Sequence, residues 1–600
     1  MHLSYSVSNY KGKSYKSYAI AESYRDGNTV RKRILWKIGK LSDEQARKIR
    51  LICQAAQDQE QLFTQLDHVV VKETRSYLDI AVVNELWKRL QLDDAFTREI
   101  TLSTLPTQTV ARILTINRCL DPRSHYSIPQ WVKTNTLTEV LNLDLSGLND
   151  DKLYYELDKI FVNQPSIEDH IFKLTYQQSP DSYRFVDYDL TTSYFVGHRC
   201  ELSAFGKGKI ECHGRRQVLL GVLINQQGYP FKWDVFPGNT AEVKTLKQNI
   251  DACKQRFQLN DQNVTLVFDR GIISAENAEE VETAGLKYIS ALDNNQIPAC
   301  GVDLKPFAGL PADIDPDDTD ISVQVPKGFK PYDDTLYYRD GSVIASKRHI
   351  VGFNPELFKD ERALRHLKLS LFDEFLATEN QNLRDAQKSR KPSATRGRII
   401  NELNRLKIRK YFHEPVLHDI ILEKKLKDGT SRSITSFQVE IERKNDVIAT
   451  EKLTDGVCVF ITNHIERKGR GFKTPAQTII KAYRDKTKIE DVFKNVKSFL
   501  KLRPFFVNTT MHVKAVYTIC ILAYFINRYM ANLRKELGEK DFLNSRELYA
   551  PFRDIDIALL EDSRSKQSAF KAVQLPEKTS NLIERLQMGH ILWQNRQTDV

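Results

Sequence analysis

The stretch YRFVDYDLTTSYF, residues 183–195, is the point at which the sequence changes from helical to extended. Upstream, residues 42–173 space their apolar side chains three and four apart, which is typical of helices. Side chains alternate between the two faces of a strand, so Asp187 and Asp189 fall on one face and their apolar neighbours on the other. The stretch therefore predicts a strand that presents two carboxylates on the same side.

The chain after this strand alternates strand-like and helical patterns. We expect a hairpin at 217–235 folded at Gln226-Gln227-Gly228, a helix at 240–257, a strand at 264–268, a helix at 274–284 and a strand at 287–291. A further strand-like run, 457–462, precedes helices from 475 to 537. This order predicts an α/β fold in which a mixed sheet is flanked by helices.

Asp269 ends the apolar strand VTLVF and is followed by Arg270-Gly271, which predicts a turn. A carboxylate at the carboxyl end of a buried strand lies at the edge of the sheet where α/β proteins form their sites. A single aspartate in this position is explained equally well as a helix cap. On its own, Asp269 therefore leaves both interpretations open.

Glu490 lies in a strongly basic part of the chain. Residues 464–503 hold twelve Lys and Arg against four acids, and seven-residue spacing brings Tyr483, Glu490 and Lys497 close to one stripe of a continuous helix. Such a carboxylate is either a member of a surface ion pair or a metal ligand beside bound phosphate. Composition alone favours the ion pair.

The pattern Tyr483-x2-Lys486-x3-Glu490-x6-Lys497 resembles the Y-(2)-R-(3)-E-(6)-K signature of DDE transposases from bacterial insertion sequences. Lys486 stands where the signature has arginine, which keeps the charge but loses the planar, two-pronged donor. Other stretches resemble the same family: YDLTTSYF resembles the first-Asp motif and contains Asp189, FPGNTAEVKTL resembles the segment after the third strand, VFDRGIISAEN resembles the second-Asp motif, and KSFLKLRPFFV follows the glutamate. The resemblance covers residues 183–295 and 455–530.

This resemblance implies a ribonuclease-H-like catalytic core. In that interpretation Asp189, Asp269 and Glu490 are the catalytic and metal-binding residues, and they hold two Mg²⁺ ions, with Mn²⁺ as a possible substitute. The residues expected to contact the DNA backbone are Tyr483, Lys486, Lys497 and Arg270. For Lys497 the alternative is a surface ion pair with Glu490.

The implied function is a transposase that cuts DNA at the ends of its insertion sequence and joins them to target DNA. Its expected partners are double-stranded DNA, as terminal inverted repeats and as target, and a second copy in a homodimer on DNA. Two alternatives remain: a stand-alone nuclease on the same fold, and a catalytically silent DNA-binding protein. The silent protein would require the loss of a carboxylate, and all three are present.

The expected domains follow from these patterns. Residues 1–75 are expected to form a β-hairpin, turning at Asp26-Gly27-Asn28, and a helix, and residues 76–180 a helical region that either binds the DNA end or is an ordinary helical domain. The catalytic core is expected at 181–299 and 456–540, interrupted by a mostly β insertion at 300–455. Residues 541–600 are expected to form a C-terminal helical region. Within the insertion we expect a hairpin turning at Asp340-Gly341, one long charged helix, and two strands turning at Asp428-Gly429.

Composition excludes several other classes. The chain has 600 residues, 10% of them aromatic, which argues against disorder and for several domains. The net charge of +11 is spread too widely to indicate DNA binding by itself, although residues 381–410 hold ten Lys and Arg against two acids. That stretch is either a solvated helix face or a phosphate-contacting patch, and we slightly favour the patch.

Cysteine spacing and hydropathy indicate the compartment. The eight cysteines include no pair two or three apart, and Cys200, Cys212 and His213 lack the further ligands of a zinc site. The most apolar run, 515–526, is shorter than the roughly 20 residues of a membrane span, and the N-terminus carries no apolar signal segment. We therefore expect a cytoplasmic protein without a membrane partner, associated with the nucleoid when active.

Overall fold

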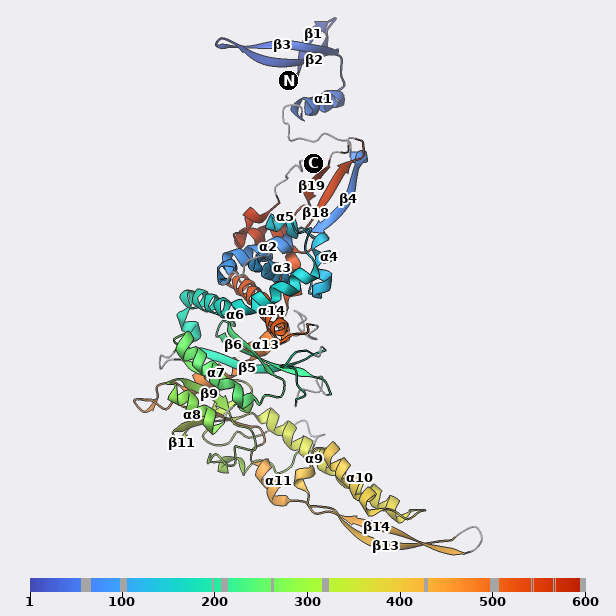
Figure 1. Cartoon of the computed structure of the whole chain (residues 1–600), viewed down its shortest axis with the longest axis vertical. Coiled ribbons are helices and arrows are strands. Elements are labelled where there is room, and N and C mark those ends of the chain that lie inside the picture. Colours follow the sequence, from blue (N-terminus) through green and yellow to red (C-terminus); the bar gives the residue numbers. More distant parts are fainter. Residues whose placement is uncertain are drawn as a thin grey trace. The chain divides into compact units, whose positions relative to one another are not determined.

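The computed structural model describes residues 1–55, 66–97, 105–196, 199–206, 214–259, 264–272, 274–315, 323–425, 430–496, 507–540, 542, 544–564, 566 and 568–593. The chain divides into two compact units (Figure 1). One comprises Met1–Ile160 with Leu522–Val600, and the other comprises Phe161–Ile521. Each unit is described separately below.

A nine-stranded mixed sheet forms the centre of the second unit. Its strands, in spatial order, are β10 (Lys330–Pro331), β11 (Tyr337–Ile344), β12 (Lys347–Phe353), β15 (Val457–Thr462), β9 (Lys287–Ala291), β8 (Thr265–Phe268), β5 (Phe185–Tyr194), β6 (Gln217–Asn225) and β7 (Pro230–Pro237). Strands β5, β8 and β9 run parallel, and the others pair antiparallel. The mixed sheet and the strands expected from 183 to 291 are confirmed.

Helices cover this sheet, as the sequence predicts. Helix α8 (Ala275–Thr283) begins after Ser274, whose hydroxyl accepts a hydrogen bond from the Asn277 N–H. Helix α12 (Ala476–Arg484) buries Ile479 and Ile480 against Val267 and Ile289 of the central strands. The region 240–257 folds as a 3₁₀ turn, the short helix α7 (Leu246–Asp251) and a π-helical turn. The alternation of strand and helix thus places an apolar layer between α12 and the strands that end near the site.

The expected insertion at 300–455 is mainly helical rather than mostly β. It contains α9 (Pro355–Arg384), α10 (Pro392–Arg405), α11 (Asn445–Lys452) and a single hairpin of β13 (Val416–Lys425) and β14 (Ser431–Glu440), with a core of its own. The segment before α9 belongs to the central sheet, because β12 pairs with β15. The long charged helix is two helices, α9 and α10.

Two predicted turns in this region have different outcomes. Gly341 lies inside β11 at an irregularity between Asp340 and Ser342, and the chain turns instead at Ala345 and Ser346, both of which have positive φ. The Asp-Gly pair therefore marks a bulge rather than a hairpin turn, since glycine supplies unusual φ in both settings. The turn expected at Asp428-Gly429 lies outside the described residues.

The first unit begins with a three-stranded antiparallel sheet, β1 (His2–Tyr10), β2 (Lys13–Asp26) and β3 (Thr29–Gly39), followed by α1 (Asp43–Ala55). The hairpin expected at Asp26-Gly27-Asn28 is confirmed, and β1 adds a strand to it. The helices that follow include α2 (Leu78–Arg89) and α3 (Thr107–Leu120).

The expected C-terminal helical region is only partly helical. Besides α15 (Ser545–Leu548) and α16 (Glu577–Arg585), it contains β18 (Asp556–Asp562) and β19 (Ser568–Ala572). Strand β18 pairs with β19 and with β4 (Val69–Ser76), which falls where the sequence predicts helix. Local periodicity could not reveal this three-stranded sheet, because the partner strands are separated by most of the chain.

Among the described helices, α14 (Thr510–Glu536) is the one long and apolar enough to cross a membrane by length and composition. Within its most apolar window, 72% is buried inside the structure. A core helix in a folded protein passes the same test, and the burial matches the core helix expected around residues 515–526.

Candidate active site

Asp189 and Asp269 each follow the last residue pair that joins the parallel strands β5 and β8. Asp189 lies within β5, which continues to Tyr194, and Asp269 comes directly after β8. The register of β5 and β8 pairs Asp187 with Val267 and Tyr188 with Phe268, so Asp189 and Asp269 are the next residues along each strand. Parallel strands end at the same edge of a sheet, where α/β proteins place their ligands. Two carboxylates that are far apart in the sequence are therefore brought together, as predicted.

Asp189 sits in a setting that disfavours its charge. Burial raises the pKa of its carboxyl to about 6, although the Leu190 N–H, which donates at 2.7 Å, and the Lys486 ammonium act in the opposite direction. The negative charges of Asp269 and Glu242 raise this pKa further. A buried carboxylate beside another one is a group that gains from a nearby cation.

Asp269 is compensated by three donors. The Tyr483 hydroxyl donates to its carboxylate at 3.2 Å, the Arg270 N–H at 2.7 Å, and the Lys486 ammonium lies at 3.0 Å. Burial raises the pKa of Asp269, but these donors outweigh it and leave the pKa below its usual value. Tyr483 and Lys486, both expected at the site, thus contact the second aspartate directly.

Asp187 shares the face of Asp189, as the strand alternation predicts, and it is 4% exposed. Burial raises the pKa of its carboxyl to about 7, opposed mainly by Lys488. Lys488 belongs to α13 (Thr487–Lys494), which packs on β5. The site therefore holds a second buried carboxylate next to Asp189, and a choice between the two needs an experiment.

No hydrogen bond or ion pair between residues that the structure describes joins Glu490 to Asp189 or Asp269. Helix α12 ends at Arg484 and α13 begins at Thr487, so Tyr483 and Glu490 lie on different helices and the expected single stripe is wrong. The Glu490 side chain is exposed. Among the described residues, no three His, Cys, Asp or Glu side chains form a group that could hold a metal ion.

Two further points concern the residues of the signature. Lys497 and the stretch after it lie outside the described residues, so its role stays a prediction. Glu242, in the 3₁₀ turn that follows β7, influences the charge of Asp189 and was missed as a site residue. Its signal was present in the sequence, because Glu242 lies within the family-like stretch FPGNTAEVKTL.

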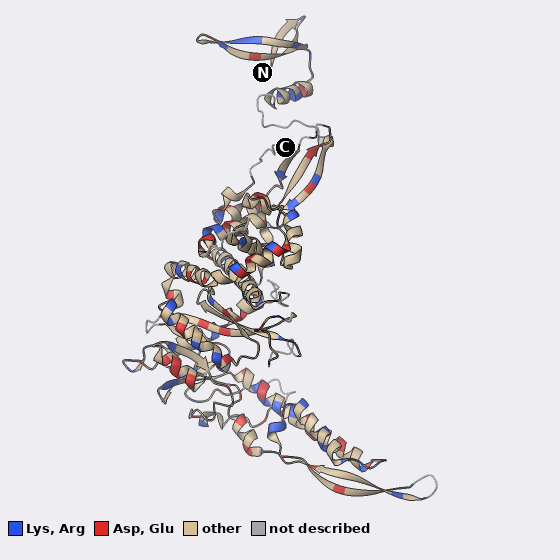
Figure 2. Cartoon of the chain, viewed as in Figure 1, with Lys and Arg blue, Asp and Glu red and all other residues tan. Residues whose placement is uncertain are grey.

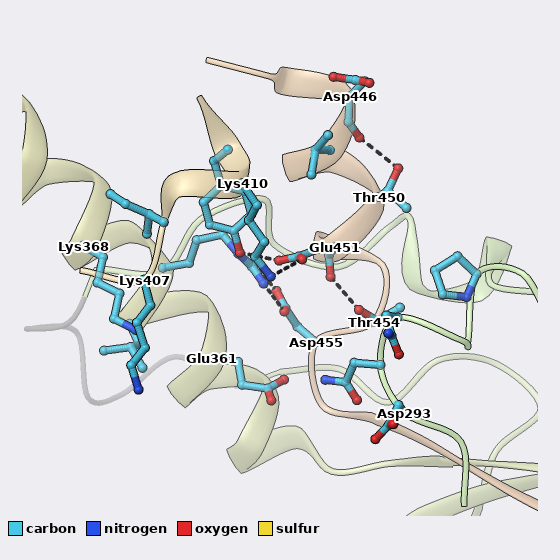
Figure 3. Close-up of a pocket in the computed structure, with 18 of the residues that line it drawn as sticks. Asp293, Glu361, Lys368, Lys407, Lys410, Asp446, Thr450, Glu451, Thr454 and Asp455 are labelled. Carbon is cyan, nitrogen blue, oxygen red and sulfur yellow. Dashed lines mark hydrogen bonds and ion pairs between the residues drawn. The ribbon is translucent and has the colours of Figure 1, made fainter. Parts of the chain in front are cut away.

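Arg270 is half-exposed and faces a cavity of about 860 Å³ lined by residues of α9, α11 and the loop after β9 (Figure 3). Its Nε lies 4.0 Å from Asp293. Elsewhere in the cavity, opposite charges pair with each other, as Arg365 does with Asp455 and Lys410 with Glu451. These ion pairs tie the insertion segments together, and Lys368 and Lys407 are further cations in the lining of the cavity.

The donor set fits a divalent cation in part. Asp189 and Asp269 offer hard carboxylate oxygens on adjacent strands, which is what Mg²⁺ and Mn²⁺ prefer. The Lys486 ammonium supplies the positive charge that lies against Asp269 in this structure. Two of the three expected ligands therefore lie together, and the third would have to approach them.

Comparison with known families identifies the class of protein. Residues 180–526 match the family model of the transposase DDE domain, and residues 4–66 match the N-terminal domain of IS1634 family transposases. Because the first match spans more than half of the chain, the protein belongs to the DDE transposase family. It is the transposase of an insertion sequence, an enzyme that cleaves DNA with the help of a divalent metal ion.

Two solved transposase structures are similar at low identity. The piggyBac transposase synaptic complex with hairpin DNA is 10% identical, covers 80% of each chain and has a TM-score of 0.33. The Mos1 transposase paired-end complex with the left transposon end is 14% identical over 41% of this chain and 77% of that chain, with a TM-score of 0.14. Neither score is high enough to define this fold. No curated protein matches the chain.

Proposed function

We propose that this transposase cuts its insertion sequence at both ends and joins them to target DNA, with Asp189, Asp269 and Glu490 as its catalytic residues. The observation that carries the proposal is that Asp189 and Asp269 both follow the last residue pair between the parallel strands β5 and β8, with Tyr483 and Lys486 on the second aspartate. All of these positions belong to the signature of the family.

The three carboxylates would hold two Mg²⁺ ions, and Mn²⁺ could replace them. When bound, the ions stabilise the charge that develops on the attacking and leaving oxygens of an in-line displacement at phosphorus. The Tyr483 hydroxyl orients the Asp269 carboxylate. Burial disfavours the ionised form of Asp189, and a bound cation would stabilise that form. In this proposal Glu490 approaches from α13 when metal and DNA are present.

The cations around the site would position the DNA backbone. Lys486 lies against Asp269, Arg270 follows it directly, and Lys497 comes seven residues after Glu490. Phosphate contacts fix the orientation of the duplex without reading its sequence. The enzyme would act as a homodimer on paired ends, because an element has two ends to be processed, and it would act in the cytoplasm at the nucleoid.

The experiment uses the full chain and a supercoiled plasmid that carries two terminal repeats, with Mg²⁺ or Mn²⁺. The expected products are double-strand breaks at the repeats and joining of the freed ends to a second plasmid, both lost with Asp269→Asn. A nuclease of the same fold would cut without joining and without needing the repeats. A catalytically silent DNA-binding protein would bind the terminal repeats without cutting them.

A further inference from the structure

The ribbon formed by the outer parts of β2 and β3, residues 22–37, is exposed on both faces. Every residue from Ser23 to Lys37 is exposed, although a strand that packs on a core alternates buried and exposed positions. Large apolar side chains are among them, including Trp36 at 71%, Val30 at 65% and Ile34 at 52% exposure. The register places Val30 and Ile34 on one face of the ribbon and Trp36 on the other, so neither face packs on a core and both are open to a partner.

The charge of this module indicates what covers the ribbon. Residues 1–40 hold nine Lys and Arg against two acids, a local +7 in a chain whose total is +11. Both acids already have partners, since Arg31 pairs with Asp26 at 3.0 Å and Arg33 pairs with Glu22. The remaining cations attract a polyanion, and Figure 2 shows Lys and Arg along β3.

The geometry of the ribbon fits the major groove. Cross-strand pairs place Arg31 opposite Tyr24 and Lys32 opposite Ser23, so successive cations of β3 point to opposite faces. A two-stranded ribbon fits a groove that is about 12 Å wide and walled by phosphates on both sides. Cations on both faces could therefore meet both backbones, and Tyr24 and Trp36 lie on the same face of the ribbon, where they are available to base edges.

We infer that residues 22–37 form a duplex-DNA-binding ribbon that enters the major groove of the transposon end. The inference rests on the proposed function, which supplies the transposon end as ligand. It assigns end recognition to this ribbon rather than to the helical residues 76–180.

A second copy of the chain is the competing occupant. Strand β3 is an edge of its sheet, and edges can pair between molecules. Here Arg31 and Arg33 are paired with acids of β2, but the same edge strand also carries Lys32 and Lys37, so two such edges would bring like charges together. Charge complementarity therefore favours DNA.

The test measures binding of the full-length protein to a labelled terminal-repeat duplex across a salt series. Lys32→Ala with Lys37→Ala should lower the slope of log K against log salt by about two units and weaken binding about tenfold or more near 0.1 M salt. The matched control, Lys11→Ala with Lys13→Ala, removes the same charge at the β1–β2 turn of the same module. This control should keep the wild-type salt slope. Equal loss of salt slope and of DNA affinity in both double variants would contradict the inference that the ribbon binds DNA.

Trp36→Ala tests sequence reading separately from charge. It should keep the salt slope and reduce the preference for the terminal repeat over an unrelated duplex of equal length by about tenfold. An unchanged preference would contradict entry into the groove. Sedimentation of the DNA-free protein checks the competing occupant: a dimer that Trp36→Ala dissociates, with DNA binding intact, would assign the surface to a second copy.

Failure of this inference differs from failure of the proposed function. If the wild type cleaves the terminal repeats and the ribbon variants bind them as tightly as the wild type, only the inference about residues 22–37 is wrong. If the wild type neither binds nor cleaves terminal repeats, the proposed function falls. Circular dichroism melts of all variants check that these exposed substitutions leave the fold intact.

Discussion

At the level of single residues, the fold disfavours the charged form of the Asp189 carboxyl. Burial raises the pKa of the Asp189 carboxyl to about 6, so this group binds its proton more tightly in the folded protein than in the unfolded chain. The stability of the metal-free protein therefore falls as pH rises from about 4 to 6, and the cost persists above that window. Catalytic sites commonly retain such costs because function requires them.

Asp189→Asn should accordingly stabilise the metal-free protein at pH 7.5, by roughly 1–3 kcal/mol, because the amide removes the buried charge. The gain should shrink as pH falls through the window from 6 to 4, where the wild-type carboxyl takes up its proton. Urea unfolding in EDTA at several pH values measures both effects. A variant less stable than the wild type at pH 7.5 would contradict this account of Asp189.

The same pair of residues separates chemistry from structure. Asp189→Asn should abolish cleavage while end binding survives, because the family motif places the catalytic carboxylate directly before Leu190-Thr191-Thr192. Asp187→Asn, one position of the same face away, should reduce cleavage less. Plasmid cleavage assays measure the activity of both variants, and gel-shift assays measure their binding to the transposon end. Equal loss of cleavage in the two variants would mean that the motif does not identify which aspartate is catalytic.

At the level of elements, the break between α12 and α13 decides where the third carboxylate lies. Lys486 sits at this break with its ammonium on Asp269, and Asp485 pairs with Lys481 at 2.7 Å. Glu490 is exposed on the helix beyond. A metal ion bound by the aspartates would replace the charge of Lys486, so rearrangement of this short connection is what could bring Glu490 inward.

Glu490→Gln should abolish metal-dependent cleavage and leave the unfolding free energy within about 0.5 kcal/mol of the wild type, since the side chain is exposed. Glu242→Gln is the matched comparison, because the charge of Glu242 acts on Asp189 in this structure. Cleavage assays at several Mn²⁺ concentrations measure both variants. Normal cleavage by Glu490→Gln together with loss in Glu242→Gln would move the third ligand to Glu242.

At the level of the whole molecule, a buried ion-pair cluster joins the insertion to the central sheet of the second unit. Asp455 lies two positions before the first residue of β15 and between Arg362 and Arg365 of α9, with its carboxylate 2.7 Å from the Arg362 Nε. Arg362 also donates to the backbone carbonyls of Ala312 and Lys452. The cluster joins the start of the insertion to the strand that returns to the sheet.

Asp455→Asn should destabilise the second unit by about 3–5 kcal/mol, because it leaves two buried guanidinium groups without their carboxylate. Asp446→Asn, an exposed change on α11 near the same cavity, is the control and should stay within about 0.5 kcal/mol. Urea unfolding of the full chain measures the difference. Equal stability of the two variants would mean that the cluster does not fasten the insertion.

Much of the catalytic half could be predicted from the sequence alone. The strands β5 to β9 and β15, the N-terminal hairpin and the positions of Asp187, Asp189 and Asp269 all follow from alternation, short apolar runs and turn residues. These signals are local, because they reflect which face of a short segment meets the core. The family signature added Tyr483 and Lys486, which indeed contact Asp269.

Other features were decided only by tertiary structure. The pairing of β4 with β18 and the entry of β12 into the central sheet beside β15 depend on partners far away in the chain. The position of Glu490 depends on the break at 485–486, which local helical periodicity does not reveal. Local sequence sets which segments can be strands and which carboxylates end them; long-range packing sets which strands become neighbours, because hydrogen-bond partners in a sheet are supplied by the rest of the fold.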